Sequence, residues 1–436
     1  MLASGSSNTG ALEPTCNIVV ANRQLWVDEV ELILSHFLFC FARPYQMKKT
    51  GHRTGSAEQP LAHLGGLSAR RFLREYWQKQ PLLIRQAFPH FAGPLDKREV
   101  LELARREDAE SRLIARSGAR WTLQQGPLAR HDLAEMKHSK WTVLIQDTQH
   151  FSNEAHDLLA RFNFIPHARV DDLMVSYAVP GAGVGPHVDS YDVFLLQGCG
   201  RRRWQISAQR DLRLKPGVPL KILSHFKAEQ EFVLESGDML YLPPGFAHNG
   251  IAETECLSWS IGFRAPSQQE LSTALLDYLR DEIVLDGQYG DPDLAPARHP
   301  GEIDAAMRRR IGIMLKDVQD ATRNVAHQQR CLGRFLTDPK PHVYFDPPEP
   351  LLSQGIFRQA AIRRGVILDR KTRFLFTGDL FFMNGSEFPA SAAGAEFFRQ
   401  LADTRKLSAE AVAGGPDKAF HACLYGAYGD GFLHIA

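Results

Sequence analysis

The sequence has few cysteines for its length, and none of them are paired in a metal-binding pattern. The 436 residues contain six cysteines with no Cys-x-x-Cys pair, and they stand far apart at Cys16, Cys40, Cys199, Cys256, Cys331 and Cys423. This excludes zinc fingers and disulfide scaffolds, which need closely spaced or framework cysteines. The thiols are expected to be free, in a reducing compartment such as the cytoplasm.

An excess of one charge and long apolar runs are also missing. Lys and Arg number 51 and Asp and Glu number 50, so the formal net charge is +1 and favours no particular partner. The apolar run 37–41 lies in a segment, 27–42, that acidic residues interrupt. It is shorter than a membrane span of about 20 apolar residues and unlike a signal peptide. The sequence therefore predicts no membrane association.

Residues 1–46 differ from the rest of the chain. They open with small polar residues and indicate a short amphipathic helix or a tail outside the fold. The alternative is that Met47 is the natural start, because the pattern described below begins just after it. The length of the whole chain predicts two or three domains.

The stretch Gly-Pro-His187-Val-Asp189 carries the strongest chemical signal. Residues two apart in a β-strand project from the same face, so the imidazole of His187 and the carboxylate of Asp189 converge. A His-x-Asp pair by itself is mostly solvated or caps a turn. Here a second histidine, His248, follows a strand-like run and a Pro-Pro-Gly turn. Two histidines and one carboxylate form the ligand set of non-haem Fe(II) oxygenases.

Short strands separated by glycine turns surround this motif, as expected of a β-barrel or sandwich. Gly181, Gly183 and Gly185 lead into no helix, so they are turn residues rather than a dinucleotide-binding fingerprint. Strands are predicted at 111–116, 121–123, 141–146, 172–179, 191–198, 201–206 and 237–242, and helices that cover them at 68–77, 96–104 and 153–162.

The combination of His187-x-Asp189, Pro-Pro-Gly-x-x-His248 and Gly-x-Gly-Arg-Arg-Arg-Trp resembles the JmjC-type 2-oxoglutarate oxygenases. More narrowly, the chain resembles the bacterial ribosomal oxygenases that hydroxylate an arginine in large-subunit ribosomal protein sixteen. The resemblance covers residues 47–436 in layout and is tightest over 171–266. It implies an α+β fold: a double-stranded β-helix of the JmjC and cupin type, a helical dimerisation region, and a C-terminal winged-helix-like domain.

The resemblance implies a role for each candidate site residue. His187, Asp189 and His248 would hold Fe(II), and 2-oxoglutarate would bind beside it with one position left for dioxygen. The distal carboxylate of the co-substrate needs a cation, and Arg202 occupies the family's position for it; a guanidinium holds a carboxylate by two parallel hydrogen bonds. Strand parity places Arg201 and Arg203 on the opposite face.

A substrate arginine would need acidic and polar neighbours beside the iron. Asp172 and Met174 share strand parity with residue 178, and Tyr191 and Ser260 match the remaining polar positions of the family's arginine pocket. The chain departs from the family at Ala178, where a serine is common; the missing hydroxyl corresponds to about 1 kcal/mol of co-substrate binding.

The remainder of the chain divides at composition changes into four predicted regions. Residues 1–46 form an extension, 47–265 the barrel with its helical cover, 266–340 a helical dimerisation region, and 341–436 the winged-helix-like domain. A helix from about 267 to 283 and a second from 302 to 335 have exposed apolar faces that need a partner surface. In the last region the helix 392–401 carries only Arg399, so no direct nucleic-acid readout is predicted.

The function predicted from these residues is an Fe(II)- and 2-oxoglutarate-dependent protein arginine hydroxylase. Its expected partners are a large-subunit ribosomal protein and a second copy of the chain, in the cytoplasm. Two alternatives remain at this stage: a non-oxygenase cupin-like metal protein, which needs no buried carboxylate clamp such as Arg202, and a JmjC-type lysine demethylase, whose pocket must admit methylammonium.

Overall fold

The computed structural model describes residues 57–134, 136 and 139–436. The predictions for residues 1–46, including a start at Met47, lie outside this range. No helix in the described ranges is long and apolar enough to cross a membrane.

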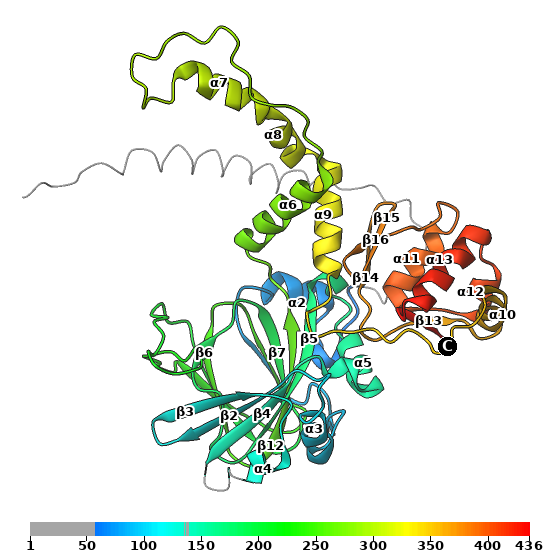
Figure 1. The fold of residues 1–436 in the computed structure, drawn as a ribbon. Helices are drawn as coiled ribbons and strands as arrows, with labels where there is room; N and C mark the ends of the chain where they lie inside the picture. The colour runs from blue at the N-terminus through cyan, green and yellow to red at the C-terminus, as the bar shows by residue number, and fades with distance from the viewer. Residues whose placement is uncertain (1–56, 135, 137–138) are drawn as a thin grey trace, which may run out of the picture. The chain divides into compact units, whose positions relative to one another are not determined.

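Two antiparallel sheets build the barrel (Figure 1). The larger sheet has eight strands, in the order β1 (Leu82–Ile84), β10 (Met239–Leu242), β7 (Asp192–Gln197), β12 (Cys256–Phe263), β5 (Val170–Ala178), β4 (Lys140–Ile145), β2 (Ser111–Ser117) and β3 (Arg120–Gln125). The smaller sheet has the order β6 (His187–Val188), β11 (Ala247–Ala252), β8 (Arg202–Ser207) and β9 (Gln230–Leu234).

Alternation along β7 explains how one strand serves two apolar layers. Phe194 and Leu196 belong to the main core, which the helices cover, whereas Val193 and Leu195 pack with Trp204 of β8 in a separate cluster. Because successive side chains of a strand point to opposite faces, a strand buried on both sides is apolar throughout. The second layer forms part of the wall of the cavity described below.

The helical cover follows the capping signals of the sequence. Ser68 accepts a hydrogen bond from the backbone of Arg71, and Asp96 and Glu99 form a complete capping box, at the starts of the predicted helices 68–77 and 96–104. Phe72 is fully buried and packs edge-on against the ring of Tyr241. The covering elements are η1 (Ala62–Leu64), α2 (Ala69–Glu75), α3 (Lys97–Leu103), α4 (Arg130–Ala134), η2 (Thr148–His150), α5 (Asn153–Ala160) and η3 (His167–Arg169).

Two helices are predicted after the barrel, and the structure contains the first but divides the second. The first, α6 (Gln268–Glu282), agrees with the predicted range of about 267 to 283 and begins at a capping box formed by Ser267 and Glu270. The prediction of one helix from 302 to 335 is wrong: three helices replace it, α7 (Ala305–Met314), α8 (Lys316–Arg323) and α9 (Val325–Thr337). Asn324 interrupts the helix because its side chain accepts from the backbone of Ala326 and caps the next one.

The C-terminal region is a small α+β unit with its own apolar core, coloured orange to red in Figure 1. Two three-stranded sheets, β17-β13-β18 and β14-β15-β16, pack with its helices. Its elements are α10 (Gln354–Arg364), β13 (Val366–Leu368), β14 (Phe374–Thr377), β15 (Leu380–Met383), β16 (Ser386–Phe388), α11 (Ala395–Thr404), β17 (Lys406–Leu407), α12 (Ala409–Ala413), α13 (Lys418–Gly429) and β18 (Leu433–Ile435).

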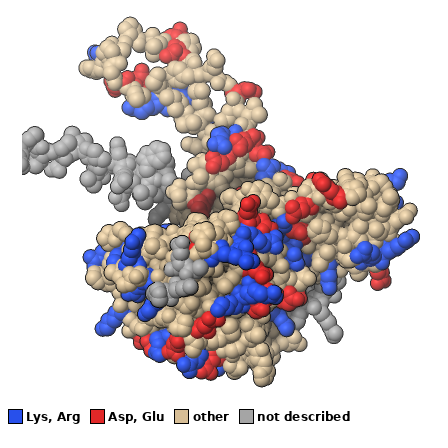
Figure 2. Space-filling view, turned by 60° about the horizontal axis from the view of Figure 1, so that its bottom comes forward, with Lys and Arg blue, Asp and Glu red and all other residues tan. Residues whose placement is uncertain are grey.

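Charged side chains of both signs share the molecular surface. In Figure 2, Lys and Arg lie beside Asp and Glu across the face shown. On this face the mixture agrees with the balanced composition of the chain.

Candidate metal centre

The pairing of β6 with β11 brings the two predicted histidines together. In this antiparallel pair His187 lies directly opposite His248, and their ring centroids are 4.2 Å apart. Side chains directly opposite in a sheet project from the same face. Asp189 follows immediately after β6 and lies just beyond the strand end. His187 and His248 are 61 residues apart in the sequence, and the register of this strand pair therefore brings them together with Asp189.

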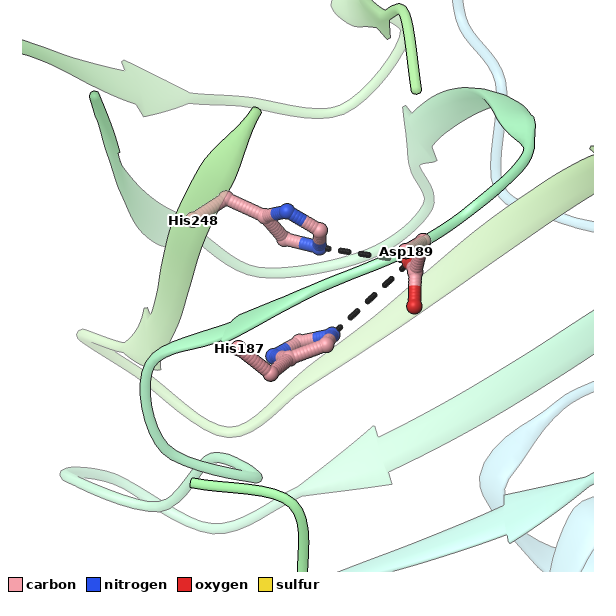
Figure 3. A group of neighbouring side chains, drawn as sticks. All are labelled: His187, Asp189 and His248. Atoms are coloured by element: carbon pink, nitrogen blue, oxygen red, sulfur yellow. Dashed lines mark ion pairs between the residues drawn. The ribbon is translucent and has the colours of Figure 1, made fainter. Parts of the chain in front are cut away.

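The three predicted ligand groups face one point. The Nε2 atoms of His248 and His187 lie 3.5 Å and 3.9 Å from Oδ2 of Asp189, and Figure 3 shows both rings directed at this carboxylate. One donor atom from each residue lies within 4.8 Å of the others. Two imidazole nitrogens and a carboxylate oxygen at this spacing fit an octahedral metal with the opposite positions open.

Backbone carbonyls orient both imidazoles. Nδ1 of His187 is 2.9 Å from the carbonyl oxygen of Gly185, and Nδ1 of His248 is 3.0 Å from that of Phe246. Because a carbonyl can only accept, each Nδ1 carries the proton and each Nε2 keeps its lone pair for a metal. Burial, and then the neighbouring His187, lower the pKa of His248 to about 4, which keeps it neutral. The donor set thus fits Fe(II).

A second group contains residue types that can bind a metal, namely Glu110, Asp147 and His342. It differs from the first group because its histidine already forms ion pairs. Both nitrogens of His342 face carboxylates, at 3.2 Å from Glu110 and 3.1 Å from Asp147. The hydrogen bond to Asp147 raises the pKa of His342, and the ammonium of Lys340 also lies 3.1 Å from Asp147. Side-chain cations already match these carboxylates, so the group is an ion-pair network.

A cavity of about 220 Å³ lies between the two sheets and opens onto the metal centre. The small sheet contributes His187, Arg202, Trp204, His248 and Gly250, and the large sheet contributes residues of β2, β4, β5, β7 and β12. Three of the four predicted substrate residues line it, namely Met174, Tyr191 and Ser260.

Arg202 lies in the wall of this cavity, as strand parity predicts. Its neighbours Arg201 and Arg203 form ion pairs with Glu253 on the opposite face of β8. Arg202 itself is buried, and in the described part of the chain no carboxylate lies within ion-pair distance of it. A buried guanidinium without an anion is costly, so the site fits a carboxylate ligand.

The hydroxyl beside this guanidinium comes from a residue that the sequence analysis missed. Nη1 of Arg202 donates to Oγ of Ser176 at 2.8 Å, and Ser176 also lines the cavity. Ala178, two residues on, packs in a small apolar cluster with Ala182 and Cys256. Ser176 therefore supplies the hydroxyl that the family commonly has at position 178. It lies two residues before Ala178 on the same face of β5, so the alternation of the strand could have identified it.

Asp172 is buried close to the cavity but does not line it. The register of β5 against β12 shifts between Ile261 and Phe263, because Asp171 and Asp172 of β5 together lie opposite the single residue Gly262 of β12. The regular alternation of side chains along β5 therefore holds from residue 178 to Met174. It is interrupted before Asp172, so the side chain of Asp172 need not face the same side of the sheet. The carboxylate of Asp172 and the ring of Tyr191 both lie next to Gly262, within 4 Å of the position that a Cβ atom would take there. Asp172 and Tyr191 are therefore close to each other.

The carboxylate of Asp172 belongs to a cluster around Lys340. The ammonium of Lys340 lies 3.1 Å from Asp147, 3.3 Å from Asp171 and 3.7 Å from Asp172. Burial, opposed by Lys340 and reinforced by the other two carboxylates, raises the pKa of Asp172 to about 6. His342 also pairs with Asp147, and Arg373 lies 3.9 Å from Asp171, so among the described residues Asp172 has only the shared ammonium of Lys340 as a counter-ion.

Comparison with known families agrees with this fold and site. Residues 157–271 match the family model of the JmjC domain, and residues 321–434 match that of the ROXA-like winged helix. The first match contains the whole candidate metal centre. The barrel, its ligand set and these matches define a JmjC-domain protein with a winged-helix C-terminal domain.

Individual relatives place the chain more narrowly. It is 33% identical over 319 residues to ribosomal protein uL16 3-hydroxylase of Escherichia coli, covering 72% of this chain and 84% of that one. It is 40% identical over 302 residues to a probable ribosomal oxygenase of Haemophilus influenzae, covering 68% and 70%. The structure of the E. coli ribosomal oxygenase YcfD with cobalt and 2-oxoglutarate matches with a TM-score of 0.73 at 30% identity, over 84% of this chain and 98% of YcfD. The chain belongs to the ribosomal oxygenase family.

Proposed function

We propose that this protein hydroxylates an arginine of large-subunit ribosomal protein uL16, using Fe(II), 2-oxoglutarate and dioxygen. The observation that carries the proposal is one cavity holding both a two-histidine, one-carboxylate ligand set and a buried guanidinium, Arg202, without an anionic partner. The E. coli relative is named for the uL16 reaction, and the YcfD structure contains cobalt and 2-oxoglutarate. A plain cupin-like metal protein has no use for Arg202.

Different residues of the site bind the metal and the co-substrate. His187, Asp189 and His248 hold the metal on one side, so that co-substrate and dioxygen bind on the other. Arg202, held by Ser176, binds the distal carboxylate of 2-oxoglutarate. When bound, Fe(II) and 2-oxoglutarate supply the oxidising chemistry, in which dioxygen gives one oxygen atom to the substrate and one to succinate, with release of CO2.

In this proposal the carboxylate of Asp172, which is buried beside the cavity, selects a cationic substrate. Met174 gives an apolar wall for the methylene groups of an arginine, and Tyr191 and Ser260 give neutral hydrogen-bonding partners. Asp172, beside Tyr191, is the carboxylate that a guanidinium would approach. An arginine buried here must stay paired, because an unpaired buried cation costs several kcal/mol.

Asp172→Asn is therefore expected to remove peptide hydroxylation while slow, uncoupled conversion of 2-oxoglutarate to succinate continues. The substitution removes the partner of the guanidinium and leaves the metal and co-substrate residues untouched. Both reactions are measured on one preparation, by mass spectrometry of an arginine-containing uL16 peptide and by succinate formation. Asp157→Asn, exposed on α5, is the matched control and should behave as the parent.

Two outcomes would contradict the substrate proposal. One is hydroxylation of the arginine peptide by Asp172→Asn at the parent rate. The other is a parent enzyme that prefers a methyl-lysine peptide, which would favour the lysine demethylase alternative. Loss of succinate formation in Asp172→Asn would instead show that the variant damages the metal or co-substrate site.

We also propose that the helices after the barrel form a homodimer. Ten large apolar side chains between 276 and 325 are exposed, namely Leu276, Val284, Leu285, Leu294, Ile303, Ile311, Ile313, Met314, Leu315 and Val325. No residue of α7 or α8 is buried within the described chain. Apolar side chains gathered in this way mark a protein interaction surface, and a second copy of the same helices is self-complementary.

The double substitution Ile311→Glu, Leu315→Glu is expected to convert a dimer into a monomer, because it places charges in the apolar face. Light scattering coupled to size exclusion should give about twice 48.9 kDa for the parent and 48.9 kDa for the variant. Leu212→Glu, on an equally exposed leucine of the barrel, serves as the control. A monomeric parent at about 50 μM would contradict the dimer.

Domain limits and location complete the proposal. We place the boundaries at 265/266 and 340/341; α6 begins at Gln268, and the proline-rich segment from Pro341 to Pro350 precedes α10. The absence of nucleic-acid readout stays a prediction, supported by Arg399 of α11 being paired with Asp379 and Glu396. A ribosomal substrate supports a cytoplasmic location.

A further inference from the structure

A second cavity lies away from the metal centre, where the C-terminal domain meets the barrel. It measures about 100 Å³ and is lined by α5, the start of β5, the segment 370–375 and Arg405. This is room for several water molecules or for a small polyatomic ion, since one water needs about 10–15 Å³ on the same measure. Nothing in the proposed hydroxylation uses this cavity.

Three guanidinium groups line this cavity, which we name the arginine cavity, and nearly all their hydrogen bonds go to neutral acceptors. Arg370 donates to the carbonyl of His150 at 3.1 Å and to Oδ1 of Asn153 at 2.6 Å. Arg405 donates to the backbone carbonyls of residues 372 and 369, at 3.0 and 2.7 Å. Arg373 donates to the backbone carbonyl of residue 171 at 3.1 Å.

The cavity lining has fewer carboxylates than guanidinium groups among the described residues. Asp171 is the one carboxylate that lines the arginine cavity within the described chain; it is 3.9 Å from Arg373 and closer, at 3.3 Å, to Lys340. The remaining cation of the lining, Lys371, is paired with Asp346. Arg370 and Arg405 have no ion pair among the described residues.

Two buried nitrogen atoms at the arginine cavity are without a hydrogen-bond partner. They are Nε of Arg405 and Nδ1 of His156, both on residues of the lining. Buried polar atoms in native proteins are nearly always paired, with protein, water or ligand. A ligand or ordered water that accepts hydrogen bonds would satisfy Nε of Arg405, and also Nδ1 of His156 in the tautomer with the proton on Nδ1.

Three histidines of the lining respond to the same positive environment. Burial first, and then the guanidinium of Arg405, lower the pKa of His156 to about 4 and lower that of His167. Burial also lowers the pKa of His150 to about 4. The carboxylate of Asp147 raises this pKa, and the cations Lys340 and Arg373 lower it. The histidines are therefore neutral near pH 7, and the arginines alone leave the cavity positively charged.

We propose that the arginine cavity binds a phosphate group, as the free ion or as the end of a small phosphomonoester. Guanidinium groups suit both carboxylates and phosphates, because their planar forks donate pairs of hydrogen bonds. Three guanidiniums and a histidine on one small cavity favour the ligand with more acceptor oxygens, and a phosphomonoester presents three where a carboxylate presents two. The bound group would join the C-terminal domain, through Arg370 and Arg373, to the barrel.

Calorimetric titration of the full-length protein with inorganic phosphate tests this proposal, at ionic strength held constant with NaCl. The parent is expected to bind one equivalent saturably. Arg370→Gln should weaken binding about 10- to 100-fold, the usual effect of losing a charged hydrogen-bonding partner. Arg364→Gln, exposed on the last turn of α10, is the control and should bind as the parent does.

His156→Phe provides a second variant, because its Nδ1 makes no hydrogen bond to the described protein and phenylalanine keeps the ring. It is expected to weaken phosphate binding about 2- to 10-fold without lowering the melting temperature in phosphate-free buffer. This variant keeps the test decisive if Arg370→Gln does not fold. Binding unchanged by His156→Phe would contradict its place in the site.

Two further titrations identify the source of the phosphate group. Ribose 5-phosphate binding more tightly than inorganic phosphate indicates a phosphomonoester, and weaker binding indicates the free ion. Acetate binding more tightly than phosphate would overturn the phosphate assignment. The proposal also fails if the parent shows no saturable binding up to about 10 mM phosphate, or if Arg364→Gln weakens binding as much as Arg370→Gln.

Discussion

The Asp189→Ala protein is expected to lose more than about 100-fold of its iron-dependent turnover while it remains folded. Replacing a group that merely orients a metal ligand already costs about 10- to 100-fold, so removal of the ligand itself costs more. The carboxylate of Asp189 is partly exposed and faces the imidazoles of His187 and His248 rather than the apolar core. Its loss therefore leaves the packing of the barrel intact.

The measurement has two parts. Succinate formation with Fe(II) and 2-oxoglutarate gives turnover, and titration with Co(II), followed by absorption, gives metal binding independently of activity. Circular dichroism checks the fold. Asp211→Ala removes a carboxylate of the same barrel that is paired with Arg213, away from the metal ligands, and should keep parental turnover. Full turnover in Asp189→Ala would show that the metal lies elsewhere.

Arg202→Met is expected to raise the apparent binding constant for 2-oxoglutarate roughly 30- to 900-fold. The guanidinium is buried and has Ser176 as its hydrogen-bonding partner, so a bound carboxylate provides its main charge compensation. Losing a bidentate charged pair in such a site costs about 2 to 4 kcal/mol, and each 1.36 kcal/mol is tenfold. The effect should lie in the concentration of 2-oxoglutarate needed for half-maximal succinate formation.

The neighbouring residue provides the matched control. Arg203→Met removes the same charge from the same strand, but on the outer face, where Arg203 pairs with Glu231 and Glu253. Its 2-oxoglutarate dependence should equal that of the parent. Ser176→Ala should give a smaller rise, roughly tenfold, because the guanidinium remains and loses one charge-assisted hydrogen bond of about 1.5 kcal/mol. If Arg202→Met saturates at the parental concentration, another residue binds the carboxylate.

Local sequence patterns predicted much of the barrel and its site because the decisive features are local. Capping residues such as Asp96 with Glu99 depend on contacts three positions apart, and the inward direction of Arg202 depends only on regular alternation along β8. The convergence of His187 and His248 needed the pairing of β6 with β11, which the sequence does not display. There the family resemblance supplied what the local pattern did not.

Features that depend on distant contacts were not predictable in this way. The β-bulge at Asp171 and Asp172 interrupts the alternation of β5 at the residue for which the sequence argument relied on it. Lys340 contacts Asp147 across 193 positions of the chain, and no local pattern announces such a pairing. The break at Asn324 was missed because apolar periodicity continued through it, whereas the side-chain cap overrides the periodicity.

The position of Lys340 also defines how far the catalytic unit extends. This residue lies beyond α9, after the barrel strands have ended, yet its ammonium reaches three buried or half-buried carboxylates of the barrel. A fragment truncated at the end of β12 would leave these carboxylates facing one another without their counter-ion. We therefore expect a stable enzyme to need the connecting segment through Lys340 in addition to the JmjC fold.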